Sequence, residues 1–160
     1  MGGKPSCQAE EVNKLKKAII FLIYFLLLIL PLTFWPGLFN QYELPKVIVF
    51  RVIIEIALGF YLLLLVTEKN FFIKQNPPFF IASLYILTVF LTSIFGVSWP
   101  TSLWGLYFRQ EGIFTLIHYF FFFFLVSQSQ FLRLKQKTAA WFLVIGAVLT
   151  SLVALWQSEV

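Results

Sequence analysis

The sequence has little charge and very few residues that commonly ligate metals. Only 12% of its 160 residues are Asp, Glu, Lys or Arg, whereas 60% are hydrophobic. A soluble domain of this size needs a more polar surface, so the composition excludes that class and indicates a membrane protein. The only cysteine is Cys7, which excludes an intrachain disulfide and a cysteine-based metal site.

Several motifs with a known chemical role are also missing. There is no Gly-rich phosphate loop, no His-Glu-x-x-His zinc motif, no Gly-x-Ser-x-Gly elbow and no run of carboxylates for a metal-bound nucleotide sugar. We therefore expect no cofactor and no metal. The basic residues are dispersed over short polar segments, so nucleic-acid binding has no support despite the net charge of +5.

The chain is dominated by long apolar stretches, and five of its phenylalanines follow one another at positions 120–124. Such a run covers every side of a helix, which is typical of a helix surrounded by lipid or apolar neighbours. The pattern predicts an all-α, polytopic transmembrane helical bundle with five spans, at about residues 18–35, 47–66, 79–95, 113–130 and 138–156. Pro31 is expected to kink the far end of the first span, and Pro45 suits the first turn of the second. Pro77 and Pro78 are expected to prevent the third helix from starting before Phe79.

Lysine and arginine are distributed unevenly over the two ends of these spans. Nine lie on the side of the polar N-terminal tail, residues 1–17, and two, Lys46 and Arg109, lie on the other. The positive-inside rule then predicts a cytoplasmic N-terminus and an outward loop at residues 96–112. The fifth span is followed by only a short outward end, residues 157–160. We expect the N-terminal portion of a longer protein, with a complete five-span protein as the alternative.

Three ionisable residues lie inside predicted spans. Arg51 and Glu55 are four residues apart on one helix face, and His118 is the only histidine. Ionisable groups at membrane depth are costly and commonly mark function, which makes Glu55 and His118 candidates for an intramembrane polar cluster. The alternatives are a self-neutralising Arg51–Glu55 pair and a hydrogen-bonded packing histidine.

The outward loop combines aromatic residues with Arg109 and Glu111. Aromatic faces and a cation beside the outer membrane surface suit sugar rings and lipid phosphates. The alternative is an aromatic belt at the interface, with Arg109 extending to water. Cations in this outward half, including Lys46 and Arg51, suit an anionic lipid-linked ligand such as a pyrophosphate, which arginine binds in a bidentate manner.

Two short motifs carry a family resemblance. Gly-Leu-Tyr-Phe-Arg-Gln-Glu-Gly at residues 105–112 resembles the Gly-Ser-Tyr-x-Arg-x-x-Gly stretch near the N-terminus of bacterial O-antigen ligase and polymerase-like membrane proteins, with Leu106 in place of the usual serine. Tyr-Glu-Leu-Pro-Lys at residues 42–46, followed by Arg51, is similar to the same family. The resemblance extends over this chain but only over the N-terminal part of such proteins.

The resemblance implies a glycosyltransferase of the bacterial inner membrane that moves a glycan from undecaprenyl pyrophosphate to an acceptor on the outer face. Such enzymes need neither a nucleotide-sugar donor nor an essential metal, and their main catalytic residues lie on a large outward loop farther along the chain. The partners implied are membrane lipid and the undecaprenyl-pyrophosphate-linked glycan. In this chain the residues expected to frame the lipid-carrier site are Lys46, Arg51, Arg109 and Glu111.

Two other functions are compatible with the same pattern. A non-enzymatic membrane scaffold would use the charged residues for stability alone. A transporter subunit would need a water-lined path that joins Glu55 and His118 to both membrane faces. The chain lacks the paired broken helices of an inverted repeat, which mark many transporters.

Overall fold

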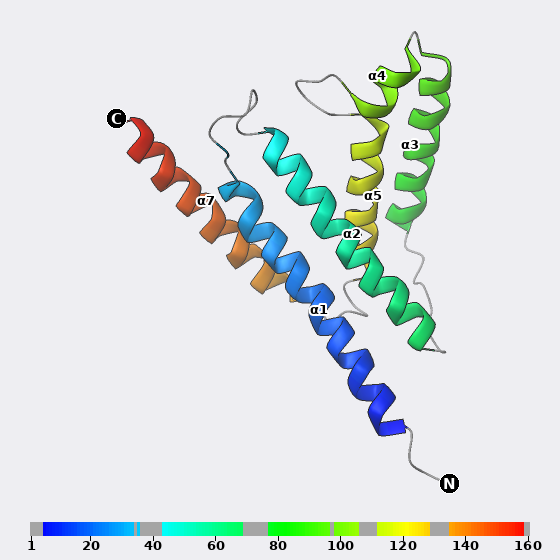
Figure 1. Cartoon of the computed structure of the whole chain (residues 1–160), viewed down its shortest axis with the longest axis vertical. Helices are drawn as coiled ribbons and strands as arrows, with labels where there is room; N and C mark the ends of the chain where they lie inside the picture. Colours follow the sequence, from blue (N-terminus) through cyan, green and yellow to red (C-terminus); the bar gives the residue numbers. More distant parts are fainter. Residues whose placement is uncertain are drawn as a thin grey trace. The chain divides into compact units, whose positions relative to one another are not determined.

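The computed structural model describes residues 5–33, 35, 43–68, 77–96, 98–105, 112–128 and 135–158, with the backbone alone for residues 5–9, 136 and 156–158. Every regular element in these ranges is a helix (Figure 1). The helices are α1 (Pro5–Leu32), α2 (Glu43–Thr67), α3 (Pro77–Ile94), α4 (Trp99–Trp104), α5 (Ile113–Ser127) and α7 (Gln136–Ser158).

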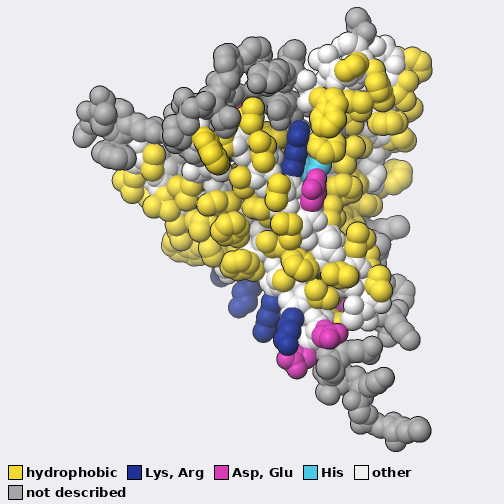
Figure 2. Space-filling model, viewed as in Figure 1, with side chains coloured by type: hydrophobic (Ala, Val, Ile, Leu, Met, Phe, Trp, Pro, Cys, Tyr) yellow, Lys and Arg dark blue, Asp and Glu magenta, His cyan; other side chains and the backbone are white. Residues whose placement is uncertain are grey.

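Four of these helices are long and apolar enough to cross a membrane: α2, α3 and the apolar parts of α1 and α7. Helix α5 is apolar but has only 15 residues, which corresponds to roughly 22 Å against a hydrocarbon core of about 30 Å. Hydrophobic side chains cover much of the visible surface (Figure 2). The chain is therefore an all-α, multi-pass membrane protein, as predicted, while the side on which its N-terminus lies stays a prediction.

Prolines lie in the first turn of two helices. Pro45 lies in the first turn of α2, as predicted, whereas α3 begins at Pro77, two residues before the predicted start at Phe79. Proline has no N–H to donate and is tolerated where the first turn needs none. Other boundaries differ from the prediction. Helix α1 begins at Pro5, 13 residues before the predicted span, and the predicted loop at residues 96–112 contains the short helix α4.

The chain divides into two compact units, and the division falls within α2. The first unit comprises Met1–Thr33, Glu55–Phe72 and Ser129–Val160, and the second comprises Phe34–Ile54 and Ile73–Gln128. Each unit has its own buried apolar side chains. In the first these are Ile19, Ile23, Leu26, Ala57, Tyr61 and Leu64, and in the second Phe50, Ile53, Ile54, Ile113 and Leu125.

In the first unit, α1 and α7 lie side by side and run in the same direction (Figure 1). Tyr24 stacks on Phe142 with ring centroids 5.3 Å apart, and farther along both helices Pro31 lies against Gly146. The hydroxyl of Tyr24 accepts the N–H of Lys135 at 3.0 Å and lies 3.2 Å from the carbonyl oxygen of the same residue. Tyr24 therefore fixes the start of α7 beside the middle of α1.

Replacing Tyr24 by phenylalanine tests this anchor, because it removes the hydroxyl and keeps the stacked ring. We expect a loss of about 0.5–1.5 kcal/mol in the free energy of unfolding, the usual contribution of such hydrogen bonds. Titration with SDS in mixed micelles measures this loss. Tyr24→Leu, which also removes the ring, should cost more, and an unchanged Tyr24→Phe variant would show that the hydroxyl does not hold Lys135.

In the second unit, α3 and α5 are antiparallel and α4 contacts both of them (Figure 1). Phe79 at the start of α3 lies between Phe120 and Phe124 near the end of α5, with centroid distances of 5.4 and 5.6 Å. At the other end of α3, Phe90 meets Trp99 of α4 edge to face at 6.3 Å. Aromatic contacts therefore fix both ends of α3 within this unit.

Candidate functional site

Arg51 is the charged residue that the structure places most specifically in the second unit. Its Nη2 donates a hydrogen bond to Thr115 Oγ1, and its guanidinium carbon lies 4.8 Å from the centroid of the Phe114 ring. Thr115 and Phe114 are consecutive residues in the first turn of α5. The guanidinium is thus oriented by a hydroxyl and an aromatic face, contacts that contribute about 1.5–3 and about 0.5–2 kcal/mol in other proteins.

Packing of the neighbouring residue brings Arg51 to this position. Phe50 is buried and contacts two rings of α5, Tyr119 at 5.1 Å and Phe122 at 5.9 Å between centroids. Thr115 is only 1% exposed, so a charged donor that reaches its hydroxyl is held in a region with little water, where hydrogen bonds are stronger. Neither Thr115 nor Phe114 carries a formal charge, so these two contacts orient the guanidinium by a hydrogen bond and an aromatic face.

His118 is buried one turn farther along α5, with 3% of its surface exposed. Its Nδ1 lies 2.7 Å from the carbonyl oxygen of Phe114, and its ring meets the Phe114 ring edge to face at 4.7 Å. A carbonyl oxygen only accepts hydrogen bonds, so Nδ1 carries the proton and donates it within the same helix. This geometry favours the interpretation of His118 as a hydrogen-bonded packing residue.

The other predicted site residues differ in how far the structure describes them. Lys46 lies on α2 five residues before Arg51, so helix geometry rotates the two side chains about 140° apart around the axis. Glu55 also lies on α2 but belongs to the first unit, whereas His118 belongs to the second. Arg109 and Glu111 lie outside the described residues. The contacts that the structure describes in this predicted site are therefore those of Arg51 with Thr115 and Phe114 of α5.

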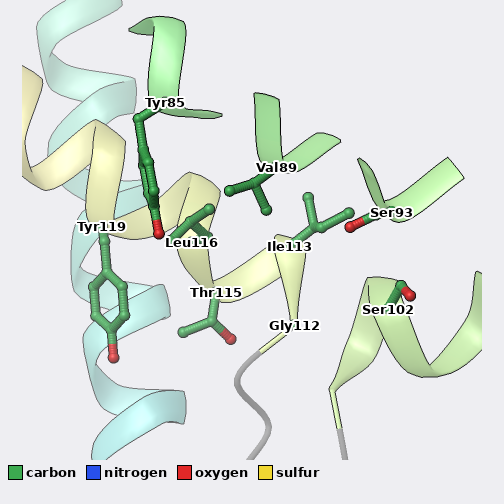
Figure 3. Close-up of a pocket in the computed structure, with 9 residues that line it drawn as sticks. All are labelled: Tyr85, Val89, Ser93, Ser102, Gly112, Ile113, Thr115, Leu116 and Tyr119. Atoms are coloured by element: carbon green, nitrogen blue, oxygen red, sulfur yellow. The ribbon is translucent and has the colours of Figure 1, made fainter. Parts of the chain in front are cut away.

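A pocket of about 390 Å³ lies beside these partners, between α3, α4 and α5 (Figure 3). Thr115 is shared: its side chain lines the pocket and accepts the hydrogen bond from Arg51. The described residues that line it are Tyr85, Val89 and Ser93 of α3, Ser102 of α4, and Gly112, Ile113, Thr115, Leu116 and Tyr119 at the start of α5. Five of these nine residues carry a hydroxyl group, and none carries a formal charge.

Two glycines of the sequence motif at residues 105–112 shape one end of this pocket. Gly105 ends α4 with φ 82°, a conformation that favours glycine, and its N–H donates to the Thr101 carbonyl at 2.8 Å. A Cβ on Gly112 would lie 2.5 Å from the carbonyl carbon of Trp104 and closer still to two other backbone atoms of α4 and its cap. Only glycine at position 112 lets the start of α5 approach α4 this closely.

Sequence reasoning missed the residues that surround Arg51 and those that line the pocket. A signal was present, because Tyr85, Val89 and Ser93 follow one another at intervals of four, as do Thr115 and Tyr119. This spacing places each set on one helix face. The spacing therefore marked residues that share a helix face, but not which faces meet around the pocket.

Comparisons of the chain with protein-family models, with curated proteins and with solved structures find no match.

Proposed function

We propose that this chain binds the pyrophosphate of a polyprenyl-linked glycan through Arg51, as the carrier-binding portion of an O-antigen ligase-type glycosyltransferase in the bacterial inner membrane. The observation that carries the proposal is the position of Arg51 in an apolar helix, where Thr115 and Phe114 orient its guanidinium. A planar guanidinium matches the oxygens of a phosphate in a bidentate manner. Cations inside membrane helices commonly mark the path or site of an ionic ligand.

The sequence resemblance supplies the substrate class. Arg51 follows the Tyr-Glu-Leu-Pro-Lys motif, and Thr115 follows the motif that ends at Gly112. The hydrogen bond from Arg51 to Thr115 therefore joins the segments that adjoin the two motifs. Arg109 and Glu111 extend the same proposal to the outward loop, and Lys46 extends it to the start of α2.

A binding measurement on the whole 160-residue chain in phosphatidylcholine nanodiscs tests this function. The probe is farnesyl pyrophosphate, a short polyprenyl pyrophosphate, and farnesol is its uncharged counterpart. We expect farnesyl pyrophosphate to bind more tightly than farnesol, and Arg51→Gln to weaken its binding about tenfold or more. The affinity of Arg51→Lys for farnesyl pyrophosphate should lie between those of the parent chain and Arg51→Gln, because lysine keeps the charge but loses the planar donors.

Two control variants test whether a loss of binding comes from the lower net charge or from lower stability of the protein. Lys14→Gln removes a cation that pairs with Glu10 at 2.8 Å on exposed α1, and should leave the affinity unchanged. Glu55→Gln removes the acidic residue one turn from Arg51. If Arg51 only forms a stabilising pair with Glu55, Arg51→Gln and Glu55→Gln will lower stability alike and Arg51→Gln will leave binding intact. That outcome would overturn the proposal and favour a scaffold.

A further inference from the structure

The pocket between α3, α4 and α5 has a lining rich in hydroxyl groups. Its hydroxyl groups come from three separate helices: Tyr85 and Ser93, Ser102, and Thr115 and Tyr119. Hydroxyl groups in an apolar environment cost free energy unless they find hydrogen-bond partners. A cavity that gathers five of them is therefore suited to a ligand that both donates and accepts hydrogen bonds.

The same pocket also offers apolar surface. Figure 3 shows Tyr85 extending from α3 toward Leu116 of α5, with Val89 and Ile113 nearby and the Tyr119 ring on the side of α5. A sugar ring has hydroxyl groups around its edge and C–H groups on its faces, which pack on aromatic rings. The volume of about 390 Å³ lies near the lower end of the range for small-molecule pockets.

The charge of the lining separates this pocket from the Arg51 position. None of the nine described residues that line it is acidic or basic. The Arg51 guanidinium contacts one of them, Thr115, through its Oγ1. The described lining therefore suits an uncharged polar group, whereas Arg51 suits an anionic one.

The surrounding helix surface indicates how such a group arrives. None of the residues of α3, all of which the structure describes, is buried. Large apolar side chains that include Leu84, Leu87 and Leu91 are exposed along it. An apolar helix surface of this kind lies against lipid chains, so a ligand with a hydrocarbon tail can enter the pocket from the bilayer.

We propose that this pocket binds the uncharged, polyhydroxylated ring of a lipid-linked sugar, with the hydroxyl groups of Tyr85, Ser93 and Ser102 as hydrogen-bond partners and the tyrosine rings as packing surfaces. The sugar is attached either to a diacylglycerol membrane lipid or to a polyprenyl carrier, since both join a sugar ring to a hydrocarbon anchor. The site does not require the pyrophosphate binding proposed for Arg51.

Native mass spectrometry of the whole chain from amine-oxide micelles tests the pocket, with lipids added singly. The probes are monoglucosyl diacylglycerol, phosphatidylcholine with the same acyl chains, and polyprenyl phosphate glucose. We expect the glucosyl lipid to be retained at least fivefold more than phosphatidylcholine. Retention of the polyprenyl-linked glucose alone would assign the ligand to the carrier, and retention of both would assign the site to the sugar ring itself.

Matched variants locate the binding. Tyr85→Phe combined with Ser93→Ala removes two hydroxyl groups and keeps the ring, and should reduce glucosyl-lipid retention to the level of phosphatidylcholine. Thr88→Ala is the control on the same helix, because its exposed hydroxyl bonds the Leu84 carbonyl and does not line the pocket. If the double variant does not fold, Ser102→Ala on α4 provides the same test with a partial loss.

The result that overturns the proposal is equal retention of all lipids, or a glucosyl preference that survives the pocket variants. Lys14→Gln, on α1 in the first unit, should leave glucosyl-diacylglycerol retention unchanged. A failure of the pocket is therefore distinguishable from a failure of pyrophosphate binding, which is measured with a different ligand and a different variant.

Discussion

Replacing Gly112 by alanine is expected to prevent the second unit from folding as described. The added Cβ would lie 2.5 Å from the Trp104 carbonyl carbon, and the backbone at Leu103 and Gly105 would be closer still. Overpacking usually costs about 1–3 kcal/mol, and the cost should exceed this range because backbone atoms cannot rotate away as a side chain can. Thermal unfolding followed by circular dichroism, together with the yield of monodisperse protein in mild detergent, measures the effect.

Gly59→Ala is the matched control for this substitution. Gly59 lies in the middle of α2, and a Cβ built on it meets no atom within 4 Å. Because alanine is a better helix former than glycine by about 0.5–1 kcal/mol, this variant should be as stable as the parent chain or slightly more stable. If Gly112→Ala behaves like Gly59→Ala, the close approach of α4 and α5 is wrong, and with it the end of the pocket.

The helical architecture could be predicted because it depends on local properties of the sequence. Apolar runs of sufficient length predict membrane helices, and a proline suited to the first turn predicts where a helix begins, as at Pro45. Helix α3 begins at Pro77, two residues before the predicted start, because proline is tolerated in the first turn. The extension of α1 back to Pro5 was missed. Its signal was the Glu10–Lys14 pair at a spacing of four, which forms an ion pair at 2.8 Å, but a mixed-charge tail before a span resembles a loop as much as a helix.

The partners of Arg51 could not be predicted, because they depend on which helix faces meet. Thr115 is one of many hydroxyl residues in apolar helices, and most of those described bond a carbonyl of their own helix. Examples with this bond are Ser83, Thr88, Thr150 and Ser151. Nothing in the local sequence separates these self-bonded hydroxyls from Thr115, whose partner is 64 residues away. The register between α2 and α5 distinguishes them, and that register is set by tertiary packing.

Replacing Gly146 by leucine is expected to separate α1 from α7. A Cβ at this position would lie 3.2 Å from Pro31 Cγ and 3.5 Å from the carbonyl oxygens of Leu27 and Leu28. Small residues let membrane helices approach closely, and here the glycine lies beside the proline ring and the Leu27 carbonyl, to which Pro31 has no N–H to donate. A leucine adds three further carbon atoms beyond Cβ, so we expect a loss of about 1–3 kcal/mol in SDS unfolding titrations.

Ala147→Leu controls for the added volume, because Ala147 is the next residue of α7 and its side chain is exposed. This variant should change the free energy of unfolding by less than about 0.5 kcal/mol. The loss in the free energy of unfolding for Gly146→Ala should fall between those for Gly146→Leu and Ala147→Leu. Pro31 needs to shift by only a few tenths of an ångström to admit a single methyl group. Equal stability of Gly146→Leu and Ala147→Leu would contradict the packing of Gly146 against Pro31. A graded loss from alanine to leucine at position 146 alone would establish that the distance between α1 and α7 is set by this glycine.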